Sequence, residues 1–244
     1  MRRLEGRRIL ITGAGSGIGS AIARRFVEEG AAVAMLDKDA SGLQAAARAT
    51  SAAAFVADVT DVGQVTDALE AAVLSLGGID GVVNAAGVLH LARFEDTELA
   101  QWQRMLDVNL TGPWIVCRAA LAHLRRASSA TVVNIASGLG LRPAANYSAY
   151  AAAKSGLITL TRALAIELAP AVRVNAVCPG AVETPMTKDL LLDPKQRTAA
   201  MANYALGRFA TTSEVANAVL FLSSSESSFT TGAALAVDGG RTFH

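Results

Sequence analysis

A cluster of glycines, set between a short apolar run and an amphipathic segment, constrains the fold of this chain more than any other feature. The apolar run 9–11 leads directly into residues 13–19, where every second residue is a glycine. Apolar residues then recur every fourth position, at Ile18, Ile22 and Phe26, which predicts a helix with one buried face. A strand, a glycine turn and a helix in this order predict the first half of a βαβ unit.

The glycines of such a turn have a mechanical role. They allow a tight turn, let a pyrophosphate approach the backbone, and let the helix pack close to the sheet. The helix N-terminus then offers free N–H groups and the positive end of its dipole to the phosphates. The sequence therefore predicts a dinucleotide site at this turn. The residues expected to form it are Gly13, Ser16, Gly17, Ile18 and Gly19.

Short apolar runs alternate with helical stretches along the rest of the chain, which predicts one α/β domain over residues 1–244. Strands are predicted at 9–11, 32–36, 53–56, 82–83, 132–135, 172–177 and 234–237. These runs carry almost no charge, as expected for parallel strands covered on both faces. The expected fold is a doubly wound, mainly parallel seven-stranded sheet flanked by helices on both faces. We expect Pro113 to kink the helical stripe 99–110, and the weakly periodic segment 185–209 to form a substrate loop.

Composition excludes several classes of protein. Lys and Arg number 22 against 21 Asp and Glu, a net charge of +1, which argues against binding of nucleic acid or of a membrane surface by charge. No apolar run reaches the length of a membrane span and no signal peptide is recognised, so we expect a cytoplasmic protein. Cys117 and Cys178 are expected to be free thiols, and the three histidines form no metal-site pattern.

An acidic residue follows the second predicted strand. Asp37 lies eighteen residues after Gly19, where a carboxylate can accept hydrogen bonds from the adenosine ribose hydroxyls. A carboxylate there would repel a 2′-phosphate, so NAD is favoured over NADP. The neighbouring cation of Lys38 could still tolerate a phosphate, and NADP stays open.

Tyr150 and Lys154 lie four residues apart within the predicted helix 150–168. Residues at this spacing share one helix face. A phenol with a pKa of about 10 is a poor base at neutral pH, and a nearby cation is expected to lower that pKa. The pair would then serve as a proton donor and acceptor for a hydroxyl or carbonyl group. The spacing by itself is not specific, and its weight comes from the glycine turn upstream.

Together these residues resemble the short-chain dehydrogenase/reductase family over nearly the whole chain, from Thr12 to Gly240. The matching motifs are the turn Thr12, Gly13, Gly17 and Gly19; the pair Asp58 and Val59; Asn84, Ala85, Ala86 and Gly87; Asn109; Ser137; Tyr150 and Lys154; and Pro179, Gly180, Val182 and Thr184. The resemblance implies a Rossmann domain. Members of the family are commonly dimers or tetramers, so a homo-oligomer is expected.

The resemblance also implies a role for each matching residue. The catalytic set is Asn109, Ser137, Tyr150 and Lys154. Tyr150 exchanges a proton with the substrate oxygen, which Ser137 also binds. Lys154 binds the nicotinamide ribose and lowers the pKa of the phenol, and Asn109 holds a water that links Lys154 to solvent. In the cofactor-binding set, which also includes Tyr150 and Lys154, the matching motif residues surround the dinucleotide. Within that set Asp37 binds the adenosine ribose, Asp58 and Val59 flank the adenine, and Thr184 binds the carboxamide.

Three functions are weighed. The first is NAD-dependent hydride transfer between nicotinamide and a secondary alcohol or ketone. The second is reduction of a 3-oxoacyl thioester with NADPH. The third, from another class, is a non-catalytic dinucleotide sensor, which predicts a damaged catalytic set, whereas all four residues are present. The four-residue spacing of Tyr150 and Lys154 argues against enoyl reductases, which use a longer one.

The substrate cleft is expected to be mostly apolar, without a clamp for a carboxylate. The residues expected to line it are Leu89, Gly138, Leu139, Tyr147 and Met186, with Leu190, Leu191 and Leu192 further on. His90 and Arg142 are the polar candidates near it.

Overall fold

The computed structural model describes residues 2–188 and 194–243. Within them a seven-stranded sheet has the order β3-β2-β1-β4-β5-β6-β7, and every neighbouring pair is parallel. The strands are β1 (Arg8–Thr12), β2 (Ala32–Asp37), β3 (Ala53–Val56), β4 (Gly81–Asn84), β5 (Ala130–Ile135), β6 (Val172–Pro179) and β7 (Ala234–Val237). The predicted doubly wound fold is confirmed, with a sheet that is wholly parallel.

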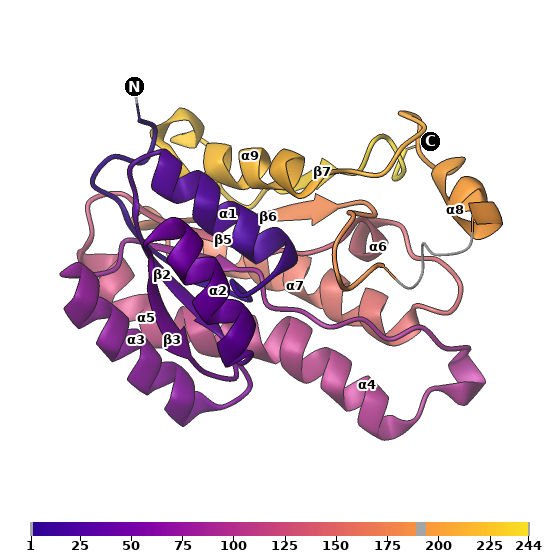
Figure 1. Ribbon diagram of the computed structural model, residues 1–244, viewed down its shortest axis with the longest axis horizontal. Coiled ribbons are helices and arrows are strands. Elements are labelled where there is room, and N and C mark those ends of the chain that lie inside the picture. The colour runs from indigo at the N-terminus through magenta and orange to yellow at the C-terminus, as the bar shows by residue number, and fades with distance from the viewer. Residues whose placement is uncertain (1, 189–193, 244) are drawn as a thin grey trace.

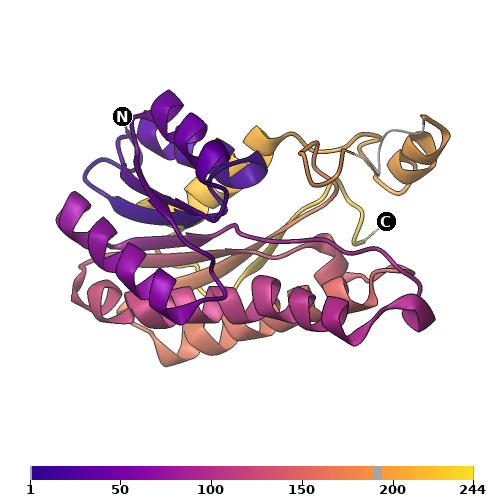
Figure 2. The same ribbon diagram turned by 60° about the horizontal axis from the view of Figure 1, so that its bottom comes forward.

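Helices cover both faces of this sheet (Figures 1 and 2). The α-helices are α1 (Gly17–Glu28), α2 (Ala40–Thr50), α3 (Val62–Leu76), α4 (Leu99–Leu106), α5 (Gly112–Arg126), α6 (Gly138–Leu141), α7 (Ser148–Glu167), α8 (Pro194–Met201) and α9 (Thr212–Ser223). α1, α2 and α9 pack on one face, and α3, α5 and α7 pack on the other. In the described part of the chain, no helix combines the length and apolarity that a membrane crossing needs.

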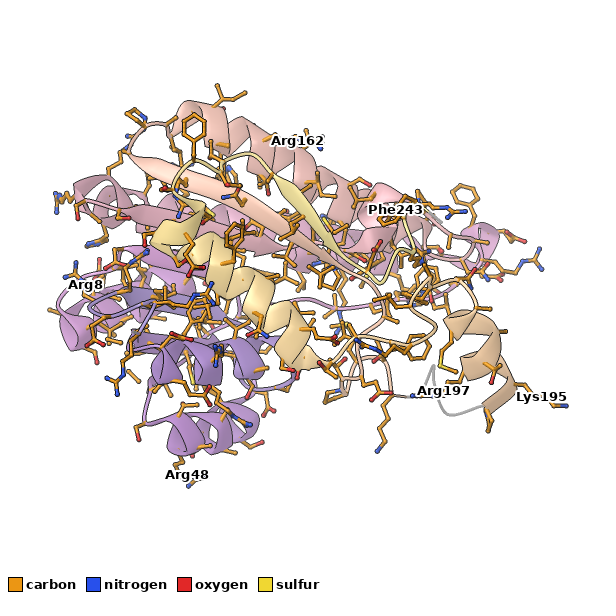
Figure 3. All side chains as sticks on the ribbon, turned by 90° about the horizontal axis from the view of Figure 1, so that it is seen from above. Arg8, Arg48, Arg162, Lys195, Arg197 and Phe243 are labelled. Atoms are coloured by element: carbon orange, nitrogen blue, oxygen red, sulfur yellow. The ribbon has the colours of Figure 1, made fainter. Side chains whose placement is uncertain are left out.

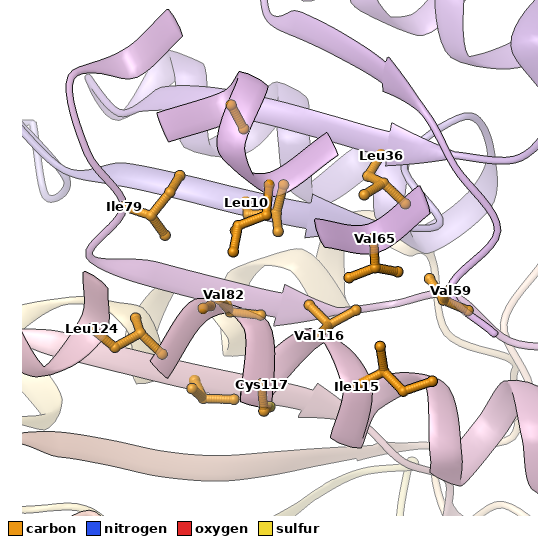
Figure 4. Close-up of a cluster of buried hydrophobic side chains, with 14 of the residues drawn as sticks. Leu10, Leu36, Val59, Val65, Ile79, Val82, Ile115, Val116, Cys117 and Leu124 are labelled. Carbon is orange, nitrogen blue, oxygen red and sulfur yellow. The ribbon is translucent and has the colours of Figure 1, made fainter. Parts of the chain in front are cut away.

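A separate apolar core lies between each face of the sheet and the helices that cover it. In the core shown in Figure 4, Leu10 and Val82 from the sheet meet Val65 of α3 and Val116 of α5, and all four are essentially buried. The core on the other face includes Phe26 of α1, which is fully buried. Burial of side chains of this kind contributes about 1.5–3 kcal/mol each, so the two cores hold the sheet as a rigid platform.

The helical segment that ends near Pro113 is interrupted differently from the predicted kink. α4 ends at Leu106, a π-helical turn spans Asp107–Thr111, and Pro113 lies in the first turn of α5. Proline lacks an N–H group and is tolerated in a first turn. The irregularity therefore lies before the proline, as an extra residue in the turn, and π turns of this kind occur often at functional sites.

The chain reverses its winding direction between β1 and β4, which are neighbours in the sheet. In such folds ligands bind beyond the carboxyl ends of the strands at this reversal. The arrows of β6 and β7 point toward the end of the molecule that carries α6, α8 and the C-terminus (Figure 1). The sheet thus presents one edge, formed by the loops after β1, β4, β5 and β6, as the place for a site.

Candidate active site

The glycine turn after β1 is packed against the loop after β4. The Thr12 hydroxyl accepts hydrogen bonds from the N–H groups of Ala85 and Ala86, both at 3.2 Å. A Cβ on Gly13 would lie 2.6 Å from the Cα of Ala86, and a Cβ on Gly19 would overlap the Gly13 carbonyl. Only glycine allows this approach, since a methyl group at either position would push the strands and α1 apart.

A cleft opens where this turn meets the loops after β2, β4 and β6. The predicted residues that line it are Gly13, Ser16, Gly17, Ile18, Gly19, Asp37, Asp58, Val59, Ala85, Ala86, Gly87 and Thr184. The side chain of Ser16, the N-cap residue of α1, makes no capping hydrogen bond. The N–H groups of the first turn are therefore available to a phosphate. This donor set and the close glycine packing fit the pyrophosphate of a nicotinamide dinucleotide.

Asp37 stands at the far end of the cleft, where β2 ends. Its carboxylate accepts hydrogen bonds from the N–H groups of Gly15 at 2.9 Å and Asp39 at 3.0 Å. The neighbouring Lys38 also lines the cleft, but its Nζ lies 3.6 Å from the carboxylate of Asp58. The ammonium of Lys38, which could have bound a 2′-phosphate, is thus already paired with Asp58. The negative charge of Asp37 faces the cleft.

The four predicted catalytic residues converge from three elements. Tyr150 and Lys154 lie in the first turns of α7, and Ser137 is the N-cap residue of α6, its hydroxyl accepting from the N–H of Leu139 at 3.1 Å. Lys154 is 4% exposed, and its Nζ donates to the carbonyl of Ile135 at 2.8 Å. The same Nζ lies 5.8 Å from the ring centroid of Tyr150. The shared helix face predicted for the pair is therefore present.

The expected lowering of the Tyr150 pKa is not found in the chain by itself. Burial raises the pKa of Tyr150 to about 12, and the nearby Ser137 hydroxyl offsets only part of this rise. Burial also lowers the pKa of Lys154 to about 8. The reason is desolvation: removing water penalises both the phenolate and the ammonium, and the ammonium is already directed to a backbone carbonyl.

Asn109 lies in the π turn and is fully buried. Its Nδ2 donates to the carbonyls of Val88 and Met105 at 3.0 and 3.1 Å, and its Oδ1 accepts from the N–H of Val88 at 3.2 Å. A Cβ on Gly87 would lie 3.1 Å from this Oδ1 and 3.7 Å from the Nζ of Lys154. Gly87 thus stands between the amide and the ammonium and leaves room beside both.

Several residues of the predicted cofactor set lie outside the cleft. Asn84 is buried under it, where Nδ2 donates to Oδ1 of Asn134 at 2.8 Å and Asn134 in turn donates to Thr161 at 2.9 Å. This chain of buried amides ties β4 and β5 to α7. Val182 is also buried and forms an isolated bridge with Ala210. Tyr150, Pro179 and Gly180 line a second cavity instead.

That second cavity has a volume of about 340 Å³ and adjoins the cleft, since Met186 lines both. Ser137 and Tyr150 face it together with the expected Leu89, Gly138, Leu139 and Tyr147. His90 lies beside a neighbouring hollow with Arg104, and Leu190, Leu191 and Leu192 lie outside the described residues. The lining also includes Thr187, Ala200, Asn203, Tyr204 and Phe209, which fall within the segment 185–209 that was expected to form a substrate loop, and Ala144, Ala181 and Arg241, which the sequence analysis missed.

Arg241 adds a positive group that the expected lining did not include, since Arg142 was the candidate named near the cavity. It follows β7 by four residues and reaches the cavity from the C-terminal tail, whereas the exposed Arg142 lies beside the cavity. No local pattern could have placed it, because its position depends on how the tail returns across the loop after β6.

A nucleotide cleft at the winding reversal, joined to a cavity that holds a serine and a tyrosine beside a buried lysine, defines a Rossmann-type oxidoreductase. Comparison with known proteins agrees with this class. Residues 13–242 match the family model described as Enoyl-(Acyl carrier protein) reductase. The chain is 41% identical over 250 residues to the 2-(S)-hydroxypropyl-CoM dehydrogenase 3 of Xanthobacter autotrophicus, covering 98% of both proteins.

Two further proteins extend the comparison. The 3-alpha-(or 20-beta)-hydroxysteroid dehydrogenase of Mycobacterium tuberculosis is 41% identical, with 98% of this chain and 90% of that protein covered. The crystal structure of 3-ketoacyl-(acyl-carrier-protein) reductase from Brucella melitensis complexed with NADH is 36% identical, has a TM-score of 0.92, and covers 98% of this chain and 100% of that one. The chain belongs to the short-chain dehydrogenase/reductase family. It is an NAD(P)-dependent oxidoreductase of secondary alcohols or ketones.

Proposed function

We propose that this enzyme interconverts a secondary alcohol and its ketone with NAD(H), and that Tyr150 is the acid and base. The observation that carries the proposal is the junction of the two cavities. Met186 lines both, the glycine turn and Asp37 lie on one side, and Ser137 and Tyr150 lie on the other. A carbinol placed at Ser137 and Tyr150 would therefore lie next to the end of the cleft. A bound nicotinamide would supply or accept the hydride there.

The residues of the chain handle the proton. Ser137 and Tyr150 would hold the substrate oxygen between two hydroxyl groups, which orients the carbinol and excludes bulk water. During oxidation Tyr150 accepts the hydroxyl proton, and during reduction it donates one. Lys154 stabilises the phenolate form through its positive charge, and the carbonyl of Ile135 holds its Nζ in place. Asn109, whose Oδ1 lies close to Gly87, would hold a water beside Lys154 and link its ammonium to solvent.

The role of Tyr150 is tested by Tyr150→Phe. We expect kcat for NAD-linked oxidation of a panel of secondary alcohols to fall by about 10²–10⁴-fold, the usual size of a general acid–base contribution. The matched control is Tyr147→Phe, which removes a second phenol from the same cavity and should change kcat far less. NAD binding, followed by fluorescence titration, should persist in all three proteins and be weakened at most slightly in Tyr150→Phe, which removes one hydroxyl of the predicted cofactor set.

Equal turnover by wild type and Tyr150→Phe would remove Tyr150 from the reaction. Tight NAD binding without turnover of any alcohol or ketone, in every variant, would favour the sensor function instead.

We propose NAD as the cofactor because Asp37 faces the cleft and Asp58 pairs with Lys38. Asp37→Ser removes the charge that repels a 2′-phosphate and the acceptor for the ribose hydroxyls. The ratio of kcat/KM for NADP to that for NAD should rise by about ten- to a hundredfold. This range corresponds to the loss of one hydrogen bond between the Asp37 carboxylate and the ribose of NAD and of the repulsion between that carboxylate and a 2′-phosphate. Asp39→Ser, at a residue that caps α2, is the control, because serine also caps helices. An unchanged ratio in Asp37→Ser would contradict the assignment.

The second candidate is reduction of a 3-oxoacyl thioester, supported by the likeness to the Brucella melitensis reductase. It is distinguished by activity on acetoacetyl-CoA with NADPH, which should exceed the activity on simple ketones with NADH if this candidate holds. Asp37 argues against it, since this carboxylate opposes the phosphate of NADPH.

Assembly and location stay predictions. We propose a homo-oligomer in the cytoplasm. Ile166 on α7 and Phe229 before β7 are large apolar side chains that are 80% and 105% exposed in the single chain, and a partner copy would cover such groups. Light scattering after size exclusion measures the assembly directly.

A further inference from the structure

The cavity that holds Ser137 and Tyr150 has one charged residue among its described lining residues, and that residue is Arg241. The rest of the lining is apolar or neutral. Among these lining residues, Arg241 is the one that can attract a ligand of opposite charge. The sign of this charge therefore selects what can bind beside the reacting carbon.

The tail that carries Arg241 is held firmly. Asp238 is 4% exposed, and its two carboxylate oxygens accept from the N–H groups of Gly240 at 3.0 Å and Thr242 at 2.9 Å. The N–H of Arg241 donates to the carbonyl of Asp238 at 3.1 Å. Both oxygens of Asp238 therefore bind the backbone on either side of Arg241. The tail forms a closed turn, and this turn fixes the backbone position from which the Arg241 side chain extends.

The guanidinium of Arg241 has no carboxylate partner among the described residues. Its one side-chain hydrogen bond there runs from Nη1 to the carbonyl of Arg142 at 3.2 Å, and Arg142 returns a bond to the carbonyl of Arg241 at 3.0 Å. By contrast, Arg7, Arg25 and Arg208 all pair with acidic side chains. The remaining donors of Arg241 are therefore available to a ligand.

Arg241 lies on the same wall as Ser137. Its Nη1 is 3.8 Å from the point that a Cβ on Gly138 would occupy, and Gly138 follows Ser137 directly. Burial raises the pKa of Tyr147 and of Tyr204, and the positive charge of Arg241 opposes this rise in both. The positive charge of Arg241 thus acts on the phenol groups of Tyr147 and Tyr204, which line the cavity.

We propose that Arg241 binds a carboxylate of the substrate, so that the enzyme acts on secondary alcohols and ketones that carry an acid group. The inference rests on the proposed dehydrogenase function of the same cavity. An arginine offers paired N–H donors in a planar fork that matches the two oxygens of a carboxylate. One guanidinium balances one carboxylate charge, whereas a phosphate at neutral pH would carry more negative charge than this wall supplies.

The test uses pairs of substrates that differ in the charge of one group. Hydroxy acids with one, two or three methylene groups between the carbinol and the carboxylate, namely 3-hydroxybutyrate, 4-hydroxypentanoate and 5-hydroxyhexanoate, are compared with their methyl esters. Wild type should prefer one of the acids over its ester by about ten- to a hundredfold in kcat/KM. The preferred chain length then reports the span between the carbinol site and Arg241.

The variants separate charge from structure. Arg241→Met should lower kcat/KM for the acids by about ten- to a hundredfold, mainly through KM, and should leave the esters nearly unchanged. Arg241→Lys should restore part of the loss, because lysine keeps the charge but not the fork. Arg241→Gln, which keeps a donor for the carbonyl of Arg142, replaces the Met variant if that one does not fold. Arg48→Met is the control: Arg48 is exposed on α2, far from the C-terminal tail that ends near Phe243 (Figure 3).

A second readout does not require turnover. Binding of 5-oxohexanoate and of its methyl ester is measured by saturation-transfer NMR in wild type and Arg241→Met. Selective binding of the acid that Arg241→Met abolishes supports the inference even if no alcohol is oxidised, in which case the proposed function fails by itself. Equal handling of acids and esters by wild type, or an equal loss of both in Arg241→Met, would overturn the inference.

Discussion

The ammonium of Lys154 is almost completely removed from solvent. The side chain is 4% exposed, and the hydrogen bond of its Nζ goes to the carbonyl of Ile135 at 2.8 Å. A single neutral acceptor does not replace the water that a cation loses, so burial lowers the pKa of Lys154 to about 8 and raises that of Tyr150 to about 12. At neutral pH the site therefore holds a charged lysine that burial disfavours, a common cost of function, beside a phenol that burial keeps neutral.

This cost predicts a pH-dependent gain in stability for Lys154→Met. The pKa of Lys154 falls from 10.5 in the unfolded chain to about 8 in the folded one, a change equivalent to about 3 kcal/mol. The burden is complete below pH 8 and disappears as the pH rises from 8 to 10.5, because the unfolded chain then binds more protons. Lys154→Met should thus raise the free energy of unfolding at pH 7 by up to about 3 kcal/mol. The advantage should shrink between pH 8 and 10.5.

Urea unfolding at pH 7, 8, 9 and 10 measures this difference. The raised pKa of Tyr150 lowers stability between pH 10 and 12, above the range of these measurements. The exposed Lys188→Met is the control and should show no such trend. A difference between wild type and Lys154→Met that stays constant with pH would contradict the buried charge.

At the scale of elements, the π turn between α4 and α5 sets the position of Asn109. The extra residue in the turn directs this side chain into the interior, where it bonds both the N–H and the carbonyl of Val88 and the carbonyl of Met105. These bonds join the turn to the loop after β4, which lines the cleft through Gly87 and Val88. The irregular turn and the loop thus form one unit.

Asn109→Ala should therefore destabilise the protein as well as impair it. The change removes the hydrogen-bond partner of groups on the half-buried Val88 and the buried Met105, which costs about 1–3 kcal/mol in the free energy of unfolding. Asn109→Asp should cost at least as much, since an oxygen would then face two carbonyls. Denaturant unfolding checks both values, with Asn217→Ala on the exposed face of α9 as the control. Unfolding midpoints equal to wild type would refute the structural role.

At the scale of the whole molecule, one largely buried cluster of charged and polar side chains joins the elements at the end of the sheet opposite the site. Arg7, just before β1, donates to the Asp80 carboxylate at 2.6 Å, to Thr131 of β5 at 3.0 Å, and to the carbonyl of Ser223 at the end of α9 at 2.7 Å. Asp80 also accepts from the backbone and side chain of Arg8. Segments more than two hundred residues apart thus meet at the amino ends of the strands.

Asp80→Ala should lower the free energy of unfolding by about 3–5 kcal/mol, because it leaves a largely buried guanidinium without its partner. Asp67→Ala, at an exposed position of α3, is the control and should change stability little. The site lies at the other end of the strands, so the folded fraction of Asp80→Ala should keep the kcat/KM of wild type. Chemical unfolding and steady-state assays at low temperature separate the two effects. A loss of activity without a loss of stability would contradict this division.

The sequence by itself determined the features that depend on local chemistry. The alternation of apolar runs and helices predicts a parallel, doubly wound sheet, because uncharged runs must be covered on both faces. The glycines of residues 13–19 predict the tight turn, because no other residue permits that approach. The spacing of Tyr150 and Lys154 places both on one helix face in any fold that contains the helix.

The tertiary structure decided whatever depends on distance in the chain or on burial. Arg241 enters the cavity because the tail folds back over the loop after β6. Asn84 lies beneath the cleft because β4 and β5 pair it with Asn134, to which its amide donates a hydrogen bond. The direction of the Tyr150 pKa reversed for the same reason. A pattern shows which charges are neighbours, but only packing determines how much water each one loses, and here the loss of water raises the pKa of Tyr150.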